Sequence, residues 1–309
     1  MRSTRRQFVL SSLPAAAATA ANKLPADGPR LLIAGLTMLD GRAQFDDTMN
    51  RDYLAHLQQG GADGVLVLGT TGEFSSFSVR ERKQILESAI RHKGKLSIMA
   101  QVATPNLPET LELLDHAARA GAGSALVLPP FYFKNPSLDG LTAFYEPVLR
   151  AARVPVYLYN IPQLSGAPIS AELLARLSSH EHLVGVKDSF SKTDAMLALM
   201  GQFPKLHYYT GVTANIAANL AAGGAGTITG SGSYFLSETL AIFEAHRKGG
   251  DRQAAQTSYD AAARAMAGYA NIPASKFAMT LRGLKESACR PPFTTLTAIE
   301  KQALKAKLT

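Results

Sequence analysis

The stretch His182-Leu-Val-Gly-Val-Lys-Asp-Ser189 places a lysine, Lys187, at the end of an apolar run. The run carries β-branched residues and predicts a buried strand that ends at this lysine. A buried ammonium group loses hydration and tends to lose its proton, and a neutral amine can form a Schiff base with a ketone. The alternative is a lysine whose long stem lies along the protein while its tip reaches solvent.

Two earlier apolar runs also end in hydroxyl groups. Val154-Pro-Val-Tyr-Leu-Tyr-Asn-Ile-Pro162 ends close to Tyr159, and Gly64-Val-Leu-Val-Leu-Gly-Thr-Thr-Gly-Glu73 leads into Thr70 and Thr71 between two glycines. A hydroxyl group can both donate and accept a proton. Together with the strand that ends in Lys187, these are three strands that each end in a polar group able to donate or shuttle a proton, and they predict one site.

From Arg30 onward, short apolar runs alternate with amphipathic stretches. The predicted strands are Leu31–Thr37, Gly64–Leu68, Leu96–Val102, Ser124–Leu128, Val154–Asn160, Leu183–Lys187, Leu206–Thr210 and Gly226–Thr229. Strands that alternate with helices are parallel, and eight such units predict an α/β protein with a (β/α)₈ TIM barrel and additional C-terminal helices. An open doubly wound sheet is the alternative, but no Gly-x-Gly-x-x-Gly opens a helix after the first strand.

Helix starts support this division of the chain. Ser78-Val-Arg-Glu81 is a capping box, in which the serine hydroxyl and Glu81 each satisfy a backbone N–H of the first turn. Asn106, Ser137 and Ser170 are predicted N-caps of later helices. In a barrel the active site lies at the carboxyl ends of the strands, where the lysine, the tyrosine and both threonines are predicted.

We expect three regions along the chain. Residues 1–29 are an export signal and linker, and residues 30–235 form the barrel through strand eight. Residues 236–309 contain the last barrel helix and an alanine-rich helical extension. These C-terminal helices exceed what a barrel needs, so they are predicted to pack on its side or on another subunit.

Composition excludes several functions. The 309 residues are 46% apolar and 18% charged, which is ordinary for a globular protein. Three units of the formal charge of +8 belong to arginines in the leader, which leaves 8 − 3 = +5 for the rest of the chain. No run of basic residues interleaved with aromatics follows the leader, so nucleic-acid binding is not predicted. The single cysteine and the scattered histidines lack metal-ligand spacing, so no metal site is expected.

The first residues predict export. Arg5 and Arg6 precede Phe8 and a weakly apolar, alanine-rich segment, and Ala18-Thr-Ala20 offers an A-x-A cleavage site. This order resembles a twin-arginine signal and predicts a periplasmic or extracytoplasmic protein. The alternative is an uncleaved extension on a cytoplasmic protein.

Three motifs resemble the class I, pyruvate-dependent aldolases that include dihydrodipicolinate synthase and N-acetylneuraminate lyase. They are Gly69-Thr-Thr-Gly-Glu73, Tyr159-Asn-Ile-Pro162 and Gly185-Val-Lys-Asp188, in the family's order and spacing. The resemblance runs from about Leu31 to about residue 300. It implies a carbon–carbon lyase without a metal or other cofactor, because the lysine itself forms a Schiff base with pyruvate or another 2-keto acid.

The resemblance also implies roles for individual residues. Lys187 would attack the keto carbon, Tyr159 would act as general acid and base, and Thr71 would relay the proton towards a second tyrosine. Thr70 would hold the carboxylate of pyruvate. Tyr132 is the tyrosine available for a contribution from a neighbouring subunit, in a homodimer or in the homotetramer usual for the family.

The sequence leaves alternatives open for several of these residues. Tyr157 lies two residues before Tyr159 on the same strand face, so the pattern alone does not choose between them. Thr70 and Thr71 could be a polar turn, and Tyr132 could be an interface aromatic without a proton to transfer.

Departures from the family pattern concern the substrate. Leu164 stands two residues after the motif's proline, where dihydrodipicolinate synthases carry an arginine for the second substrate's carboxylate. Thr213 and Ala214 stand where the sialic acid lyases carry an acidic pair. Together with Ser189, these positions favour a shorter, hydroxylated 2-keto-3-deoxy sugar acid, and Ser165 and Ser231 are further candidates for its hydroxyls. Gly72 and Ile228 complete the predicted substrate-binding residues.

The predicted function is reversible aldol cleavage of such an acid to pyruvate and an aldehyde. The alternatives are 4-hydroxy-tetrahydrodipicolinate synthase and a 2-keto acid dehydratase that uses the same lysine. A protein of a different class, an exported 2-keto acid binding protein, would have no use for a tyrosine and a threonine that relay protons. No nucleic acid and, after signal removal, no membrane is an expected partner.

Overall fold

A computed structural model describes residues 28–190 and 192–309. The export signal predicted for residues 1–29 lies almost entirely outside the described residues. Within the described ranges, no helix combines the length and the apolar character that a membrane crossing needs.

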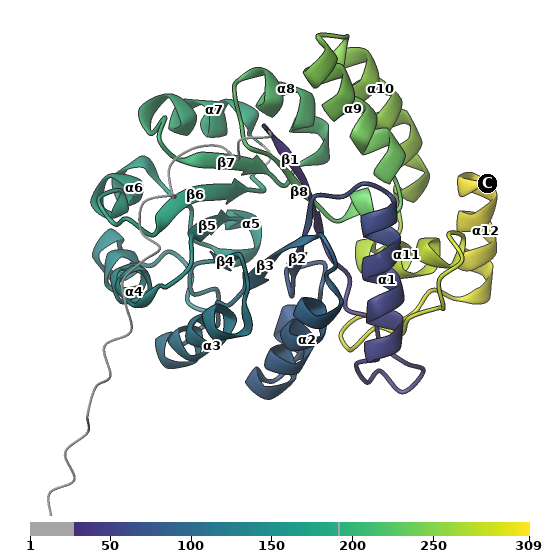
Figure 1. Cartoon of the computed structure of the whole chain (residues 1–309), viewed down its shortest axis with the longest axis horizontal. Helices are drawn as coiled ribbons and strands as arrows, with labels where there is room; N and C mark the ends of the chain where they lie inside the picture. Colours follow the sequence, from purple (N-terminus) through teal and green to yellow (C-terminus); the bar gives the residue numbers. More distant parts are fainter. Residues whose placement is uncertain (1–27, 191) are drawn as a thin grey trace, which may run out of the picture.

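Eight parallel strands close into a barrel in the order of the chain, and the last strand pairs with the first (Figure 1). The strands are β1 (Arg30–Ala34), β2 (Gly64–Val67), β3 (Ser97–Gln101), β4 (Ser124–Val127), β5 (Val156–Asn160), β6 (Leu183–Asp188), β7 (His207–Thr210) and β8 (Gly226–Thr229). The α/β class and the (β/α)₈ TIM barrel predicted from the alternating pattern are therefore confirmed. Predicted and observed strands differ only at their ends; β5, for example, begins after Pro155, which has no backbone N–H for the ladder.

The helices surround the barrel and continue beyond it (Figure 1). They are α1 (Asp47–Gln59), α2 (Val79–His92), α3 (Leu107–Ala120), α4 (Leu138–Ala151), α5 (Pro162–Ser165), α6 (Ala171–Leu177), α7 (Thr193–Gln202), α8 (Ile216–Ala221), α9 (Leu236–Lys248), α10 (Arg252–Ala263), α11 (Asn271–Thr280) and α12 (Ala298–Leu308). The capping box of Ser78 and Glu81 forms, and Asn106, Ser137 and Ser170 cap their helices as predicted.

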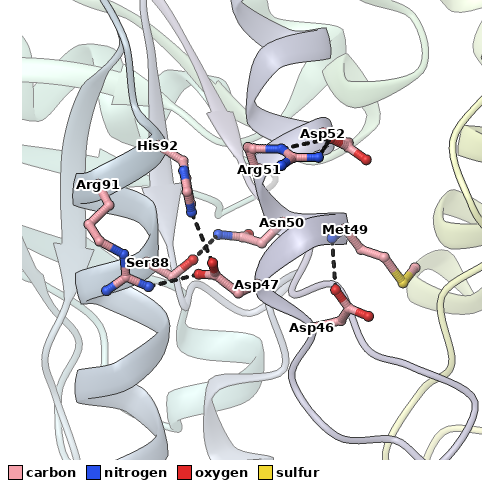
Figure 2. A network of polar contacts seen from close by, with 9 residues as sticks. All are labelled: Asp46, Asp47, Met49, Asn50, Arg51, Asp52, Ser88, Arg91 and His92. Carbon is pink, nitrogen blue, oxygen red and sulfur yellow. Dashed lines mark hydrogen bonds and ion pairs between the residues drawn. The ribbon is translucent and has the colours of Figure 1, made fainter.

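The outer helices are joined to one another by polar as well as apolar contacts. Figure 2 shows such a network between α1 and α2, in which Asn50 Nδ2 donates to Ser88 Oγ at 2.9 Å. Asp47 accepts from Arg91 at 2.8 Å and lies 3.0 Å from His92 Nε2. This network lies between the helices outside the barrel, so it does not take part in the site at the strand ends.

The C-terminal helices α11 and α12 pack on each other and have a small apolar cluster of their own. Ala274, Leu296 and Leu304 form its buried centre. The segment after α11 also returns to the barrel, where Ser287 Oγ accepts from the backbone N–H of Leu39 at 2.8 Å. The C-terminal region therefore touches the loop that follows β1, at the carboxyl end of the strands.

Candidate active site

Lys187 and Tyr159 are direct partners in the parallel pairing of β6 with β5. Both side chains are 3% exposed, and Lys187 Nζ lies 4.1 Å from the centre of the Tyr159 ring. The strand pairing itself therefore brings together the two residues that the sequence placed at strand ends. The alternative of a lysine tip exposed to solvent does not hold.

The hydroxyl group of Tyr159 has polar neighbours from the segments that follow β2 and β6. Thr70 Oγ1 and Ser189 Oγ each lie 3.5 Å from it. Burial by itself raises the pKa of this hydroxyl, but Lys187 and the hydrogen bonds from Ser189 and Thr70 outweigh burial, so the pKa of Tyr159 lies below its ordinary value. A tyrosine whose pKa is lowered in this way is better suited to accept and return a proton near neutral pH.

The structure separates Tyr159 from Tyr157, which the strand pattern alone could not do. Tyr157 pairs with Gly185, and its ring occupies the space that a side chain at position 185 would fill. Its hydroxyl lies 3.4 Å from His207 Nδ1, and burial raises the pKa of Tyr157 far above its ordinary value. Tyr157 is therefore a packed residue one layer below the lysine.

A second pair of residues joins the same strand ends. Asn160 and Asp188 are direct partners in the β5–β6 pairing, and Asn160 Nδ2 donates to Asp188 Oδ2 at 2.6 Å. Burial raises the pKa of Asp188, while the bonds from Asn160 and from the backbone N–H of Phe190 act in the opposite direction. This buried bond fixes the ends of β5 and β6 immediately beyond the tyrosine and the lysine.

The two threonines lie in a tight turn after β2. Glu73 has a left-handed backbone conformation with φ of 55°, and its N–H donates to the carbonyl of Thr70 at 3.1 Å. Gly72 is needed because a Cβ there would come within 2.9 Å of the Gly35 carbonyl oxygen. The turn therefore has little conformational freedom, and both Thr70 and Thr71 line the cavity described next.

These side chains line a cavity of about 380 Å³ at the carboxyl ends of the strands. Its lining residues are Ala34, Thr70, Thr71, Tyr159, Ile161, Gln163, Lys187, Ser189, Gly211, Val212, Thr213, Ile228, Thr229, Gly230, Ser231 and Asn271. Lys187 is the single charged side chain among them. The other polar groups are hydroxyls and amides.

The cavity brings together most of the predicted site residues. Seven of the ten predicted residues line it: Lys187, Tyr159, Thr70, Thr71, Ser189, Thr213 and Ile228. Gly72 supports the turn from behind and does not line the cavity. The prediction that Thr71 relays the proton of Tyr159 stays untested, and in this chain it is Thr70 that lies within 3.5 Å of the tyrosine hydroxyl.

Tyr132 and Leu164 do not line the cavity of this single chain. Tyr132 is 75% exposed and packs edge to face against Phe133, and Leu164 is 53% exposed. The carbonyl oxygens of Leu164 and Phe131 both accept from Lys134 Nζ. Ser165, the further candidate for a substrate hydroxyl, is fully buried with its hydroxyl bonded to backbone carbonyls.

Sequence reasoning did not single out several lining residues. Gln163, the residue before Leu164 in the chain, lines the cavity, and its Nε2 donates to the Ser189 carbonyl at 2.8 Å. Asn271 comes from the start of α11, which no strand-end motif marks. Gly211 leaves room for the lysine, because a Cβ there would lie 3.1 Å from Lys187 Cε.

Metal ligands do not gather anywhere in the described part of the chain: it holds no group of three or more His, Cys, Asp or Glu side chains that could bind a metal ion. The chemistry available in the cavity is that of an amine, a phenol and several hydroxyls. These groups suit Schiff-base formation followed by proton transfer.

Comparisons with known proteins assign the chain to a family. The model of the dihydrodipicolinate synthetase family matches residues 29–309. A DapA-like lyase of Chloroflexus aurantiacus is 39% identical over 82% of this chain and 87% of its own length. A 4-hydroxy-tetrahydrodipicolinate synthase of Acidothermus cellulolyticus is 31% identical over 89% of each chain.

A solved structure agrees with these sequence matches. The structure of YagE, a prophage protein of the dihydrodipicolinic acid synthase family from E. coli K12 in complex with pyruvate, is 26% identical. It superimposes with a TM-score of 0.85 over 90% of this chain and 97% of that chain. The protein is a carbon–carbon lyase of the lysine Schiff-base class, and the chain belongs to the dihydrodipicolinate synthetase family.

Proposed function

We propose that the protein cleaves a 2-keto-3-deoxy acid with an uncharged, hydroxylated tail into pyruvate and an aldehyde, reversibly. Lys187 forms the Schiff base, and Tyr159 transfers the protons. The lyase class alone does not specify the substrate, since relatives of this chain include a DapA-like lyase and 4-hydroxy-tetrahydrodipicolinate synthases.

The observation that carries the proposal is the lining of the cavity. Lys187 is its only charged side chain in the described part of the chain. The remaining polar groups are neutral, and beyond Tyr159, Thr70 and Thr71 they are Thr213, Ser189, Gln163, Thr229, Ser231 and Asn271. Hydroxyl groups of a substrate can be held by hydroxyls and amides, whereas a second carboxylate buried here would lack a cationic partner. The cavity therefore favours a neutral tail.

The steps follow from the residues in the cavity. Unprotonated Lys187 attacks the keto carbon, and loss of water gives an iminium group that withdraws electrons from C3. Removal of the proton from the C4 hydroxyl then breaks the C3–C4 bond, which releases the aldehyde and leaves an enamine. Protonation at C3 and hydrolysis release pyruvate and regenerate the lysine. Tyr159, beside the lysine and in contact with Thr70, is placed to accept and return these protons.

Thr70 is proposed to hold the carboxylate of the pyruvate moiety, and Thr71 to relay protons at the same turn. A second subunit is proposed to supply Tyr132, whose exposed position leaves it free to reach a neighbouring cavity. Dimerisation would then be part of the active site, within a homodimer or homotetramer.

The second candidate function is 4-hydroxy-tetrahydrodipicolinate synthase, the name that several relatives carry. It would require a cation for the carboxylate of its second substrate. Leu164 supplies none, and no lining residue other than Lys187 does so. The neutral lining therefore favours cleavage of a sugar acid over this synthesis.

The test is a comparison of kcat/KM for cleavage of 2-keto-3-deoxy sugar acids with kcat/KM for condensation of pyruvate with aspartate semialdehyde. We expect cleavage to be faster. Borohydride reduction in the presence of pyruvate should add the pyruvate-derived mass to the Lys187 peptide, and Lys187→Ala should abolish it. Condensation that exceeds cleavage by more than about tenfold would support the synthase instead, and a chain that binds pyruvate without any turnover would support a binding protein.

A further inference from the structure

A buried ion pair lies behind the turn that carries the two threonines. Lys276 Nζ of α11 is 2.5 Å from Glu73 Oε1, and the two side chains are 1% and 0% exposed. Burying two charges requires a large loss of hydration, so such a pair is weak evidence for stability by itself. Its location next to the catalytic turn suggests a second role.

Both oxygens of Glu73 are held by the C-terminal part of the chain. Oε1 faces Lys276, and Oε2 accepts from the backbone N–H of Arg290 at 2.9 Å. Lys276 Nζ in turn donates to the carbonyl of Ala288 at 2.5 Å. Residues 287–290, here called the C-terminal strap, and α11 therefore enclose the Glu73 carboxylate from two sides.

The strap is itself fixed to the barrel around this turn. The guanidinium of Arg290 donates to the carbonyls of Ala43 at 3.0 Å and Ser76 at 2.8 Å, and to Glu81 Oε1 at 2.6 Å. It also lies 4.3 Å from the centre of the Phe77 ring. The strap is thus bonded to the loop between β1 and α1, to the segment that follows the β2 turn, and to Glu73 of the turn itself.

Glu73 transmits this support to the threonines through its backbone. Its N–H closes the turn on the Thr70 carbonyl, and its left-handed conformation is unfavourable for a residue with a side chain. The carbonyl of Gly72, one residue earlier, accepts from Thr37 Oγ1 at 2.7 Å. A conformation of this kind persists only when its surroundings impose it, and the enclosed carboxylate contributes to this together with the backbone bonds of the turn.

We propose that the Glu73–Lys276 pair and the C-terminal strap position Thr70 and Thr71 for the 2-keto acid. Glu73 and Lys276 are positioning residues: they do not line the cavity and act through the turn. The C-terminal extension is then part of the substrate site, although it lies outside the eight strand–helix units. This inference rests on the proposed function, since it assigns the keto acid to this turn.

The test measures how pyruvate occupancy depends on the pair. Full-length protein is reduced briefly with borohydride at graded pyruvate concentrations, and the trapped fraction is read by intact mass. Glu73→Gln keeps the shape of the side chain and removes its charge, and Lys276→Met removes the other charge. Each should raise the half-saturating pyruvate concentration by roughly tenfold or more, because small displacements of positioning groups are costly.

A double variant and a matched control separate positioning from stability. Glu73→Gln/Lys276→Met leaves no unpaired buried charge, so it should regain thermal stability relative to the single variants while its half-saturating pyruvate concentration stays high. The control is Ser88→Ala, which deprives buried Asn50 of its partner in the α1–α2 network of Figure 2. It should lower the melting temperature without changing the response to pyruvate.

The outcomes distinguish this inference from the proposed function. If all variants trap pyruvate like the unmodified protein and differ only in melting temperature, the pair is merely structural and the inference is wrong. The inference is also wrong if the double variant regains both its thermal stability and the half-saturating pyruvate concentration of the unmodified protein. If the unmodified protein itself forms no adduct at Lys187, the proposed function fails.

Discussion

Lys187 Nζ lies 4.1 Å from the centre of the Tyr159 ring because the two residues face each other across the β5–β6 pairing. The next pair along the same strands, Asn160 and Asp188, is joined by a buried hydrogen bond of 2.6 Å. Backbone ladder and side-chain bond together restrict the relative motion of the nucleophile and its proton carrier. A class I lyase needs this restriction, since both groups act on the same few atoms of the substrate.

Tyr159→Phe should keep Schiff-base formation and lose turnover. The variant retains Lys187 and the ring that packs beside it but has no hydroxyl to transfer protons, so kcat should fall by roughly 10²–10⁴-fold. The pyruvate adduct should still form on prolonged borohydride reduction. Tyr157→Phe is the matched control, because its hydroxyl contacts His207 one layer below the cavity, and its kcat should stay close to that of the unmodified protein. Near-normal turnover in Tyr159→Phe would remove this tyrosine from the mechanism.

Much of the site could be predicted because strand ends are visible in the sequence. Lys187, Tyr159 and the two threonines each end an apolar run, and parallel strands bring such ends to one edge of a barrel. The strand pattern did not choose between Tyr157 and Tyr159, since both share a strand face. The Tyr159-Asn-Ile-Pro162 resemblance implied Tyr159, and the pairing of Tyr157 with Gly185 adds that the Tyr157 ring lies deeper in the barrel.

Other contributions have no local signal. Asn271 lines the cavity and Lys276 contacts Glu73 of the turn. Both belong to α11, a helix for which the sequence shows only an alanine-rich helical pattern. The sequence left Glu73 open between a helix-start acid and a residue that orients the site, and favoured the former. Its partner Lys276 lies on a distant segment, and no short-range pattern connects the two. Such contacts depend on how the C-terminal region packs, which a single sequence does not reveal.

The Glu81–Arg290 contact should make stability depend on pH in acid. The hydrogen bond from Arg290 lowers the pKa of Glu81 from 4.5 to about 2 in the folded protein. Because the folded pKa is depressed, this pair stabilises the protein fully above pH 4.5, and its contribution is lost as the pH falls from 4.5 towards 2. Urea unfolding over this range should therefore show that the free energy of unfolding falls less with acidification in Glu81→Gln than in the unmodified protein. The glutamine can still complete the capping box with Ser78. If the free energy of unfolding depends on pH equally in the variant and in the unmodified protein, the contribution of the Glu81–Arg290 pair is contradicted.

Tyr132 should act across a subunit interface. Tyr132→Phe and Lys187→Ala should each be nearly inactive alone, and co-assembled mixtures of the two should regain activity, because a mixed pair contains one cavity with both groups intact. Phe133→Leu is a suitable control, since Phe133 is equally exposed and has no hydroxyl. Failure of the mixed oligomers to regain activity, with assembly verified, would restrict Tyr132 to its own chain or to a packing role.

The leader should be removed on export. Arg5 and Arg6 precede an apolar segment and the Ala18-Thr-Ala20 site, so the N-terminus of the mature protein is expected near Ala21 in an extracytoplasmic fraction. N-terminal sequencing of the native protein checks this, and Arg5→Lys/Arg6→Lys should retain it in the cytoplasm. Cellular protein that begins uniformly at Met1 would favour the cytoplasmic alternative.

The last prediction concerns the position where a synthase carries arginine. Leu164 is half-exposed outside the cavity of a single chain, while its neighbour Gln163 lines it. An arginine that pairs with the second carboxylate of aspartate semialdehyde should contribute about 1.5–3 kcal/mol, which is about one to two decades in kcat/KM. We expect Leu164→Arg to raise condensation relative to sugar-acid cleavage, provided that the new guanidinium can approach the cavity beside Lys134, whose ammonium already binds the carbonyl of residue 164.

Gln163→Arg is the matched variant for this test, because it places the same charge one residue earlier on a side chain that already faces the cavity. If Leu164→Arg shifts the ratio and Gln163→Arg does not, position 164 is the determinant that the family pattern implies. If only Gln163→Arg shifts the ratio, Leu164 does not contact the substrate, in agreement with its exposed position. Specificity then depends on Gln163, which lines the cavity. If neither variant changes the ratio, the neutral lining is not what keeps the second carboxylate out. The preference must then come from contacts of the sugar tail with lining hydroxyls and amides such as those of Thr213, Ser189 and Asn271.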